Sequence, residues 1–518
     1  MSGKSVIWPH GGQTPKRGKG DCPHYGTQAR SDQFVDGDCP RPSHAGSGSD
    51  PRAAVHIDFT NAMAAAVGKK DGVAPAEIKP FQRKVAAGHK ALLAGRKSGK
   101  LGFFDLPYQK AIVNDINGTV NELKGRCENF VVLGIGGSAL SNIALQASLN
   151  HPFYNLLDRG ARGGFPRIFI MDNVDPEYFA GMLDVIRPEE TIFNIISKSG
   201  GTAEPMSQFM IIREILERRL GPSAPEHIVA TTDRENGLLR EIVGREGFES
   251  FVIPDNVGGR FSALTPVGLL SVAMGGIDIA GLLEGAAAMD KRCSTPALLK
   301  NPAYLNSVIH HIADVKKGKS ISVMMTYSNA LYLIADWYRQ LWAESLGKKY
   351  DLKGREVYTG QTPVKALGAT DQHSQVQLYT EGPNDKIFTL VGVEKYRREV
   401  AIPKIYDQYD DLEYLCGKTM NALIDAERIG TTLVLTDAKR PNLTLTLPEI
   451  NAHTIGQVLQ FYEISSAFAG QLYGINAFDQ PGVEAGKIAA FTLMGHKKYA
   501  AQRRAVVKKI RRDKKWIL

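Results

Sequence analysis

The sequence predicts an α/β protein built on two doubly wound parallel sheets, with flanking helices at the N- and C-terminal ends. Between residues 126 and 290, and again between residues 300 and 475, apolar runs of strand length alternate with stretches of helical pattern. This alternation is typical of βαβ units, which form a parallel sheet with helices on both faces. A chain of 518 residues is also too long for one ordinary hydrophobic core, so two or three domains are expected.

The first α/β segment, residues 126–290, contains five short apolar runs that we predict to be strands. They are Phe130–Leu133, Arg167–Met171, Thr191–Ile196, His227–Ala230 and Ser250–Ile253. The stretches between them with helical pattern include Ala139–Leu149, Glu204–Arg219 and Gly237–Val243. The parallel sheet that follows from this order brings the carboxyl ends of its strands to one edge.

The second α/β segment, residues 300–475, begins with a predicted strand at Ser320–Thr326 and a long helix pattern from Asn329 to Ser345. Further strands are predicted at Lys386–Val393 and Thr431–Leu435. The boundary between the two α/β segments is expected near residues 285–315.

The two ends of the chain differ from this pattern. Residues 55–125 suit helices, such as one from Ile78 to Leu93, and residues 476–518 are expected to form a C-terminal helical segment with a basic tail. Residues 1–54 contain few aliphatic side chains and much Gly, Pro and Ser. Such a composition cannot bury enough apolar surface to offset the entropy of ordering, so we expect a disordered or non-native extension.

Composition narrows the class of protein. Residues 497–518 carry ten Lys or Arg and one acid, Asp513. The net charge of this segment therefore equals the net charge of the whole chain, +9. We interpret this tail as a solvated helix rather than a nucleic-acid-binding element.

No apolar run approaches the ~20 residues of a membrane span, and the N-terminus lacks the apolar core of a signal peptide. Five scattered cysteines without a C-x-x-C pair indicate neither a disulfide scaffold nor a zinc site, so a cytoplasmic protein is expected.

Two loops rich in glycine and hydroxyl groups follow predicted strands of the first segment. Phe130–Leu133 runs into Gly134–Ser138, and Thr191–Ile196 runs into Ser197–Thr202; a helix pattern follows each loop. Because a helix N-terminus offers free N–H groups and a positive dipole end, both loops suit an anion. We predict that together they bind one phosphate group through Gly137, Ser138, Ser197, Lys198, Ser199 and Thr202.

A nicotinamide-dependent oxidoreductase is the main alternative. Gly134, Gly136 and Ala139 also satisfy the G-x-G-x-x-A fingerprint of dinucleotide-binding loops. Asp172 could serve as the ribose-binding acid, although it lies farther along than the ~20 residues that this pattern expects. The hydroxyl cluster of the second loop favours a terminal phosphate instead. A non-catalytic sugar-phosphate sensor is a second alternative, which would need the loops but no catalytic side chains.

Two further segments each place one cation among glycines, where the backbone can approach a ligand closely. Residues 255–268 contain Arg260, and residues 478–487 contain Lys487. Together they resemble the two signature segments of the phosphoglucose isomerase family. This family has the sugar-isomerase fold, and its motifs occur in the expected order along this chain.

The resemblance implies reversible conversion of glucose 6-phosphate into fructose 6-phosphate, a reaction that requires no metal or redox cofactor. Glu344, in the string Glu344–Lys348, is then the base that carries a proton between adjacent carbons. Arg260 neutralises the enediolate that forms. The helix pattern from Asn329 places Glu344 near a helix C-terminus, where the dipole disfavours a carboxylate. Without the resemblance, an exposed surface glutamate would be the simpler interpretation.

The resemblance also implies how the sugar ring opens. His373 assists ring opening with Lys487 as its partner, and in the family this histidine reaches the active site of the neighbouring subunit. A homodimer is therefore expected, with the sugar phosphate as its substrate and no nucleic-acid or membrane partner. Glu204 orients the histidine, and Gln480 binds substrate nearby. For Lys487 a plain salt bridge is the alternative, because Glu484 lies three residues before it on a helix pattern.

Overall fold

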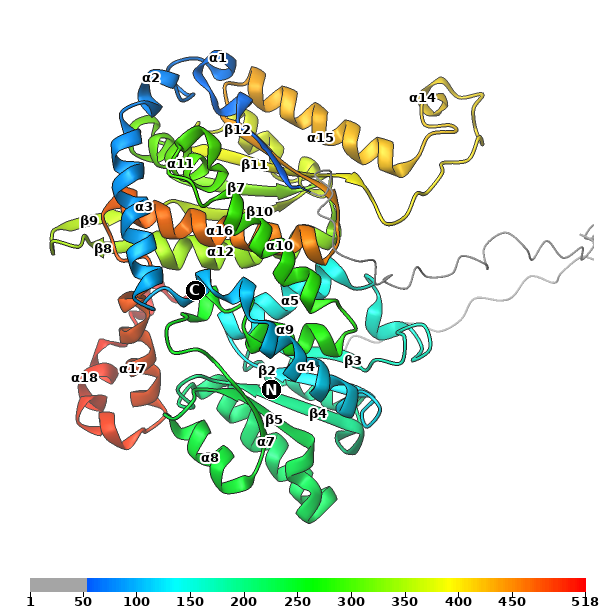
Figure 1. Ribbon diagram of the computed structural model, residues 1–518, viewed down its shortest axis with the longest axis vertical. Helices are drawn as coiled ribbons and strands as arrows, with labels where there is room; N and C mark the ends of the chain where they lie inside the picture. The colour runs from blue at the N-terminus through cyan, green and yellow to red at the C-terminus, as the bar shows by residue number, and fades with distance from the viewer. Residues whose placement is uncertain (1–53) are drawn as a thin grey trace, which may run out of the picture. The chain divides into compact units, whose positions relative to one another are not determined.

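A computed structural model describes residues 54–518 (Figure 1). The predictions made for residues 1–53 lie outside the described residues. The strands are β1 His56–Asp58, β2 Asn129–Leu133, β3 Arg167–Met171, β4 Thr191–Ile196, β5 Ile228–Thr232, β6 Glu249–Val252, β7 Ile321–Thr326, β8 Lys348–Tyr350, β9 Glu356–Thr359, β10 Thr362–Leu367, β11 Lys386–Lys395 and β12 Asn442–Glu449.

The helices alternate with these strands, as the mixed α/β pattern predicts. They are α1 Ala64–Val67, α2 Pro75–Ile78, α3 Phe81–Lys97, α4 Lys110–Leu123, α5 Gly137–Leu149, α6 Pro176–Val185, α7 Ala203–Leu220, α8 Leu238–Glu246, α9 Pro266–Met274, α10 Ile279–Arg292, α11 Pro302–Lys317, α12 Tyr332–Leu346, α13 Val376–Glu381, α14 Asp410–Glu413, α15 Met420–Asp437, α16 Ala452–Tyr473, α17 Glu484–Leu493 and α18 Arg503–Lys509.

The first sheet has the strand order β3-β2-β4-β5-β6, and all its neighbouring strands are parallel. Its two faces bury different side chains, because successive residues of a strand point to opposite sides. Phe130 and Val132 belong to a core that includes residues of α4, α5 and α9. Val131 and Leu133 belong to a second core with residues of α6, α7 and α8. Helices therefore cover both faces, which confirms the doubly wound prediction.

The second sheet has the order β1-β12-β11-β7-β10. β7, β10, β11 and β12 are parallel, whereas β1 joins the edge antiparallel to β12. In the first sheet β2 lies between β3 and β4, the two strands that follow it in the chain. In the second sheet β7 lies between β10 and β11, the next two parallel strands of that sheet. In each sheet the direction of winding thus reverses beside this strand, β2 or β7. Ligands of open parallel sheets bind at such a reversal.

The strand predicted at Thr431–Leu435 is wrong, because these residues lie within α15. Thr431 and Leu435, four positions apart, are the buried residues of this helix, whereas Leu433 and Val434 are exposed. Burial at a spacing of four is the period of a helix, not of a strand. The further parallel strands of this segment are β10 and β12, and neither was predicted from the sequence. β10 contains Pro363, which is tolerated because β10 is an edge strand.

The helices on either side of the expected boundary near 285–315 pack on the same partner. α10 and α11 both lie against α16. Gly285 of α10 approaches so closely that a Cβ atom there would lie 1.8 Å from the carbonyl oxygen of His453. The division of the chain at residues 285–315 stays a prediction.

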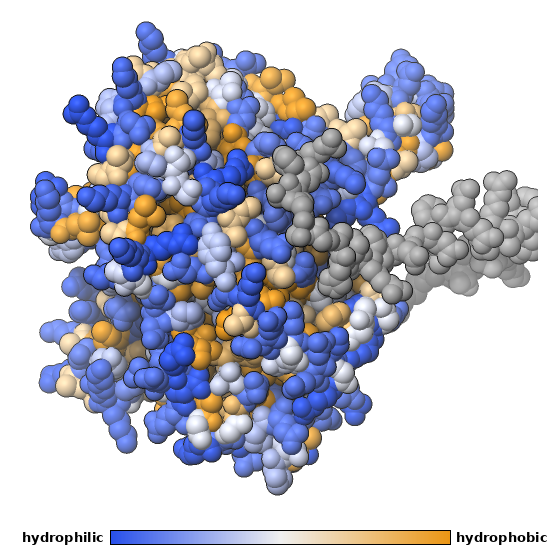
Figure 2. Space-filling model, viewed as in Figure 1, coloured by the Kyte–Doolittle hydropathy of each residue, from blue (hydrophilic) through white to orange (hydrophobic). Residues whose placement is uncertain are grey.

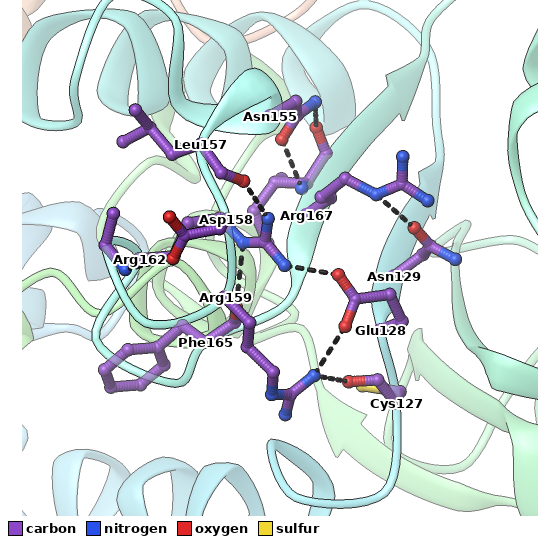
Figure 3. A network of polar contacts seen from close by, with 12 residues as sticks. Cys127, Glu128, Asn129, Asn155, Leu157, Asp158, Arg159, Arg162, Phe165 and Arg167 are labelled. Carbon is purple, nitrogen blue, oxygen red and sulfur yellow. Dashed lines mark hydrogen bonds and ion pairs between the residues drawn. The ribbon is translucent and has the colours of Figure 1, made fainter.

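A charged network fixes the amino end of β2 (Figure 3). Glu128, next to β2, accepts hydrogen bonds from Arg159 Nη1 at 2.9 Å and from Arg162 Nη2. Burial opposes ionisation of Glu128, but the bonds from both arginines outweigh it and hold the pKa of this carboxyl below its usual value of 4.5. The network ties residues 158–162 to the strand that leads into the first of the two loops predicted to bind phosphate.

Among residues 54–518, no helix has both the length and the apolar composition that crossing a membrane requires.

Candidate active site

A cavity of about 600 Å³ opens at the carboxyl end of the first sheet. It lies between the ends of β2 and β4, where the winding direction of the sheet reverses. The loops after β2, β4 and β5 line it, together with Gly259 and Gln480 from later in the chain. Of the predicted phosphate-binding residues, Ser138, Ser197, Lys198, Ser199 and Thr202 are among its walls.

Two helices begin at this cavity. Gly136 immediately precedes α5 and Thr202 immediately precedes α7, and neither helix has a side chain that caps its first N–H groups. The first N–H groups of a helix have no partner within the helix. Both N-termini can therefore donate hydrogen bonds to an anion in the cavity, supported by their dipoles.

The loop after β4 is held in place by its own hydroxyl groups. Ser197 Oγ accepts a hydrogen bond from the Gly200 N–H at 3.0 Å and donates one to Thr202 Oγ1 at 3.3 Å. Ser199 Oγ accepts one from the Gly201 N–H at 3.2 Å. The three hydroxyl oxygens are thus positioned before any ligand arrives, which lowers the entropy cost of binding.

Gly137 has a different role from that of its neighbours. A Cβ atom at this position would lie 2.1 Å from the carbonyl oxygen of Gly259, so only glycine allows the contact. The short helix Gly259–Phe261 therefore packs directly on the start of α5. This close packing places Gly259, the neighbour of Arg260, in the wall of the cavity that Gly137 was predicted to help form.

Lys198 lines the cavity but directs its ammonium group to the protein. Its Nζ donates hydrogen bonds to the carbonyl oxygens of Pro254 at 3.1 Å, Asp255 at 2.8 Å and Val257 at 3.4 Å. Lys198 thus links the loop after β4 to the segment that leads into Arg260.

Arg260 is buried, with 3% of its surface exposed. Nε donates to Ser345 Oγ at 2.8 Å, and Nη1 donates to Gln480 Oε1 at 2.9 Å and to Glu344 Oε2 at 3.3 Å. Nη2 donates to the carbonyl oxygens of Ala477 and Asp479. Burial lowers the pKa of Arg260 and Glu344 opposes this shift. The guanidinium still stays charged, because its pKa begins far above neutrality.

Glu344 lies in the last turn of α12, as the sequence predicts. Its Oε1 accepts a hydrogen bond from Gln340 Nε2 at 3.1 Å, and its Oε2 faces Arg260. The Glu344 side chain is about one third exposed, so the carboxylate remains open to a ligand. Gln480 connects Glu344 to the cavity, because it lines the cavity and also accepts a hydrogen bond from Arg260, which contacts Glu344.

His373 lies away from this cluster within the same chain. α12 follows β7 and ends beside Thr359, the last residue of β9, whose Oγ1 donates to the carbonyl oxygen of Leu346 at 2.9 Å; β10 begins three residues later, at Thr362. Glu344 is therefore near the beginning of β10, whereas His373 follows its end. A six-residue strand spans about 20 Å, so the two side chains are at opposite ends of the second sheet.

Lys487 is also separate from the cluster. In α17 its Nζ forms an ion pair with Glu484 Oε1 at 3.2 Å, and both side chains are more than half exposed. The sequence predicted this salt bridge as the alternative to a role of Lys487 in ring opening. Glu204 lies in the first turn of α7, two residues after Thr202. Among residues 54–518, the carboxylate of Glu204 and the imidazole of His373 have no bonding partner.

Several groups at the site were not singled out from the sequence. Gln340, Ser345 and Lys348 all surround Glu344. Gln340 could have been found, because a residue four positions earlier lies on the same face of a helix. Asp233 and Asn236 line the cavity after β5, where the strand-end rule that located the other loops also applies. Within the described residues, no three His, Cys, Asp or Glu side chains are grouped to hold a metal ion.

Comparison with known proteins shows to which family the chain belongs. The family model described as phosphoglucose isomerase matches residues 115–506. A glucose-6-phosphate isomerase of Carboxydothermus hydrogenoformans is 46% identical over 466 residues, which cover 90% of this chain and 100% of the relative. A glucose-6-phosphate isomerase of Rubrobacter xylanophilus is 45% identical over 375 residues, covering 72% of this chain and 84% of the relative.

Solved structures give the same result. A hypothetical protein from Thermus thermophilus has a TM-score of 0.76 and 35% identity, covering 85% of this chain and 100% of that one. A glucose-6-phosphate isomerase from Chlamydia trachomatis has a TM-score of 0.67 and 25% identity, covering 77% and 76%. The order of motifs, the fold and these similarities lead to one conclusion: the chain belongs to the phosphoglucose isomerase family.

Proposed function

We propose that this protein interconverts glucose 6-phosphate and fructose 6-phosphate. The observation that carries the proposal is the 3.3 Å contact between Arg260 and Glu344, beside a cavity onto which two helix N-termini open. A cavity of this kind suits a phosphate, and a carboxylate next to a buried cation suits proton transfer on the attached sugar.

The phosphate group binds at the N-termini of α5 and α7. Ser138, Ser199 and Thr202 donate hydroxyl hydrogen bonds, and free backbone N–H groups add to them. Gln480, which lines the same cavity, contacts the sugar between the phosphate and Glu344. Binding one end of the substrate in this way fixes the position of its reacting carbons.

The isomerisation is a proton shuttle. Glu344 removes the proton from C2 of the open-chain aldose, and the electron pair of the broken C–H bond forms the C1–C2 double bond of an enediolate. The negative charge on oxygen is stabilised by Arg260, which is already buried and oriented. Glu344 then returns the proton to C1, and the proton of the C2 hydroxyl passes to the oxygen on C1, which yields the C2 carbonyl and the C1 alcohol of the ketose. No group is oxidised or reduced from outside the sugar.

Ring opening requires a separate acid and base, and we assign these roles to His373 and Lys487. Because His373 and Glu344 lie at opposite ends of the second sheet, one chain cannot bring both to the same sugar. We therefore propose a homodimer in which His373 enters the active site of the neighbouring subunit. The unpartnered carboxylate of Glu204, beside the phosphate loop, is placed to orient the incoming histidine.

Exposed apolar side chains support an assembly of two chains. Residues 397–419, between β11 and α15, are mostly exposed, and Figure 1 shows them extending away from the second sheet. Among the side chains there are Val400, Ile405, Tyr406, Tyr409, Leu412 and Tyr414, which are 41–63% exposed. In Figure 2 apolar residues lie among hydrophilic ones on this segment. Apolar side chains gathered on a projecting segment often mark a protein interface.

We also propose that the protein is cytoplasmic. Cys127 and Cys293 are buried free thiols, and Cys416 is a partly exposed free thiol. Thiols that stay reduced are usual in the cytosol.

The test is conversion of fructose 6-phosphate, coupled to oxidation of the resulting glucose 6-phosphate by a dehydrogenase that reduces NADP. The purified protein should be active after dialysis against EDTA. The matched control is the Glu344→Gln protein from the same preparation, which accounts for isomerase carried over from the host. Absence of conversion, or equal conversion by the control, would overturn the proposal.

A further inference from the structure

Lys348 is a buried cation next to the proposed catalytic base. It is the first residue of β8, and only 5% of its side chain is exposed. Lysine is almost never buried without a partner. Its Nζ donates a hydrogen bond to the backbone carbonyl oxygen of Glu344 and lies 3.8 Å from Asp479 Oδ1.

These two contacts join the end of α12 to the segment that carries Gln480. The Glu344 carbonyl belongs to the last turn of α12, where carbonyl groups have no partner within the helix. A cation there is also favoured by the dipole. Arg260 joins the same two parts, because it donates to the Glu344 carboxylate and to the backbone oxygen of Asp479. Lys348 and Arg260 are thus two separate links between one helix end and one segment.

The charges around Glu344 balance. Lys348 and Arg260 are positive, and Glu344 and Asp479 are negative. Burial, followed by repulsion from Arg260, lowers the pKa of Lys348 from 10.5 to about 8, against the opposing attraction of Asp479 and Glu344. At neutral pH Lys348 is therefore charged, and the four groups sum to zero. When Lys348 loses its proton at higher pH, the cluster carries one net negative charge.

We propose that Lys348 is a positioning residue for the isomerisation: its ammonium group holds the Glu344 end of α12 against the Asp479–Gln480 segment and keeps the cluster neutral before the enediolate forms. This inference rests on the proposed function. Lys348 acts through Glu344 rather than on the substrate, because its ammonium group is occupied by the Glu344 carbonyl and by Asp479. The phosphate cavity is not lined by Lys348.

A selective kinetic effect follows. Loss of the ammonium group displaces the base and adds net negative charge where the enediolate must form, so that kcat falls. Substrate binding depends chiefly on the phosphate loops, so that KM changes little. Activity of the unaltered protein should also decline as pH rises through about 8, since the charged form of Lys348 is the one that supports the reaction.

The test compares Lys348→Met with Lys349→Met between about pH 6 and pH 10, a range that contains the relevant titration. Lys349 is the adjacent residue of the same strand, but it is exposed and pairs with Glu356. We expect Lys348→Met to lower kcat at pH 7 by about 10- to 100-fold, the size of effect that a small displacement of a reacting group causes. It should also lose the decline near pH 8, whereas Lys349→Met should match the unaltered protein in both respects.

A second variant guards against a simple folding defect. Lys348→Arg keeps the positive charge, and a guanidinium does not titrate in this range. It should retain activity at pH 7 and move the alkaline decline to higher pH. Binding of sorbitol 6-phosphate, which has no carbonyl to isomerise, reports whether the phosphate site of each variant is intact.

The outcomes separate the two proposals. An unaltered protein without isomerase activity overturns the proposed function. If the unaltered protein is active and Lys348→Met has the same kcat and the same pH profile, the proposed role of Lys348 is overturned. Where Lys348→Met fails to fold or to bind sorbitol 6-phosphate, the pH profile of Lys348→Arg decides: an unchanged decline near pH 8 refutes the proposal.

Discussion

Arg260 Nη1 lies 3.3 Å from Glu344 Oε2, although the two residues are 84 positions apart in the sequence. The contact joins the segment after the first sheet to the end of α12 beside the second sheet. Because Arg260 is buried and bound on all sides, it cannot move away from the carboxylate at small cost. The proposed base and the group proposed to stabilise its product are therefore fixed together before substrate binds.

Glu344→Gln should abolish proton transfer while it preserves binding. Glutamine keeps the shape of the side chain and can still bond to neighbouring groups, but it cannot accept the C2 proton. A positioned general base contributes about 10²- to 10⁴-fold, so we expect kcat to fall by at least that range. Exchange of the C2 proton of glucose 6-phosphate with deuterium from solvent, followed by NMR, isolates this step. Exchange at the unaltered rate would place the base elsewhere.

Arg260→Lys should lower both activity and stability. Lysine keeps the charge but lacks the planar array of donors that contacts Ser345, Gln480 and the backbone of residues 477 and 479. We expect kcat to fall by about 10²-fold or more, as when one oxyanion donor is removed. The free energy of unfolding should fall by about 1–3 kcal/mol, because buried carbonyl groups lose a donor. Denaturant titration and steady-state kinetics measure the two effects.

The same substitution at Arg355 is the matched control. Arg355 pairs with Asp351 and is 71% exposed, so Arg355→Lys should change neither quantity by a measurable amount. If Arg260→Lys behaved like this control, the five contacts of Arg260 would not matter for the reaction.

Ser199→Ala and Thr202→Ala should chiefly weaken substrate binding. Each removes one hydroxyl that faces the phosphate cavity, and a hydrogen bond to a charged group is worth about 1.5–3 kcal/mol. KM for both sugar phosphates should therefore rise, while kcat at saturation changes less. Ser207→Ala is a control on the exposed side of α7, where the hydroxyl bonds to the carbonyl of Glu204. An unchanged KM in both cavity variants would contradict the phosphate assignment.

Much of the fold could be predicted because the central strands of the first sheet, β2, β4 and β5, are buried on both faces. β2 and β4 are completely buried, and such runs stand out from the helices between them. β10 could not be predicted in the same way, since Pro363 and Lys365 interrupt its apolar pattern. The edge position of β10 permits the proline, and Lys365 pairs with Asp336. The strand placed at Thr431–Leu435 failed because a short apolar run does not reveal its period until burial is known.

The site could be predicted where one local rule applies. Strand ends and helix N-termini located from sequence the two loops that line the cavity, whereas their binding of phosphate stays a prediction. The contact of Arg260 with Glu344 and Gln480 depends on three distant segments, and no local pattern reports the distance between them. No role could be predicted for Lys348, because a lysine just after a helix is usually exposed to solvent. Only the structure shows that its side chain is buried.

Glu128→Gln should reduce stability at neutral pH and lose this effect in acid. The folded-state pKa of Glu128 is depressed, so its contribution is present above the usual value of 4.5 and disappears as pH falls through the folded value. Arg162, its partner, is only 2% exposed and would lose a charged acceptor. We expect a loss of about 1–2 kcal/mol in the free energy of unfolding at pH 7. Glu226→Gln, which breaks the exposed pair with Arg126, should have little effect. A Glu128→Gln deficit that stayed the same at pH 3 would rule out this explanation.

Mixing two inactive variants should restore activity if His373 acts across a subunit interface. A mixed dimer of Glu344→Gln and His373→Ala contains one site in which both residues are altered and one in which both are native. Random exchange of subunits makes half of the dimers mixed, so activity should reach about a quarter of that of the unaltered protein, by the symmetry of a two-fold dimer. Subunits are exchanged by brief denaturation and refolding of the mixture, and each variant refolded alone is the control. If His373 served the Glu344 of its own chain, no dimer in the mixture would contain an intact site, and the mixture would stay as inactive as its components. A mixture that remains inactive while sedimentation confirms dimers would therefore reject the exchange of His373, and the separation of His373 from Glu344 by the length of β10 would then need another explanation.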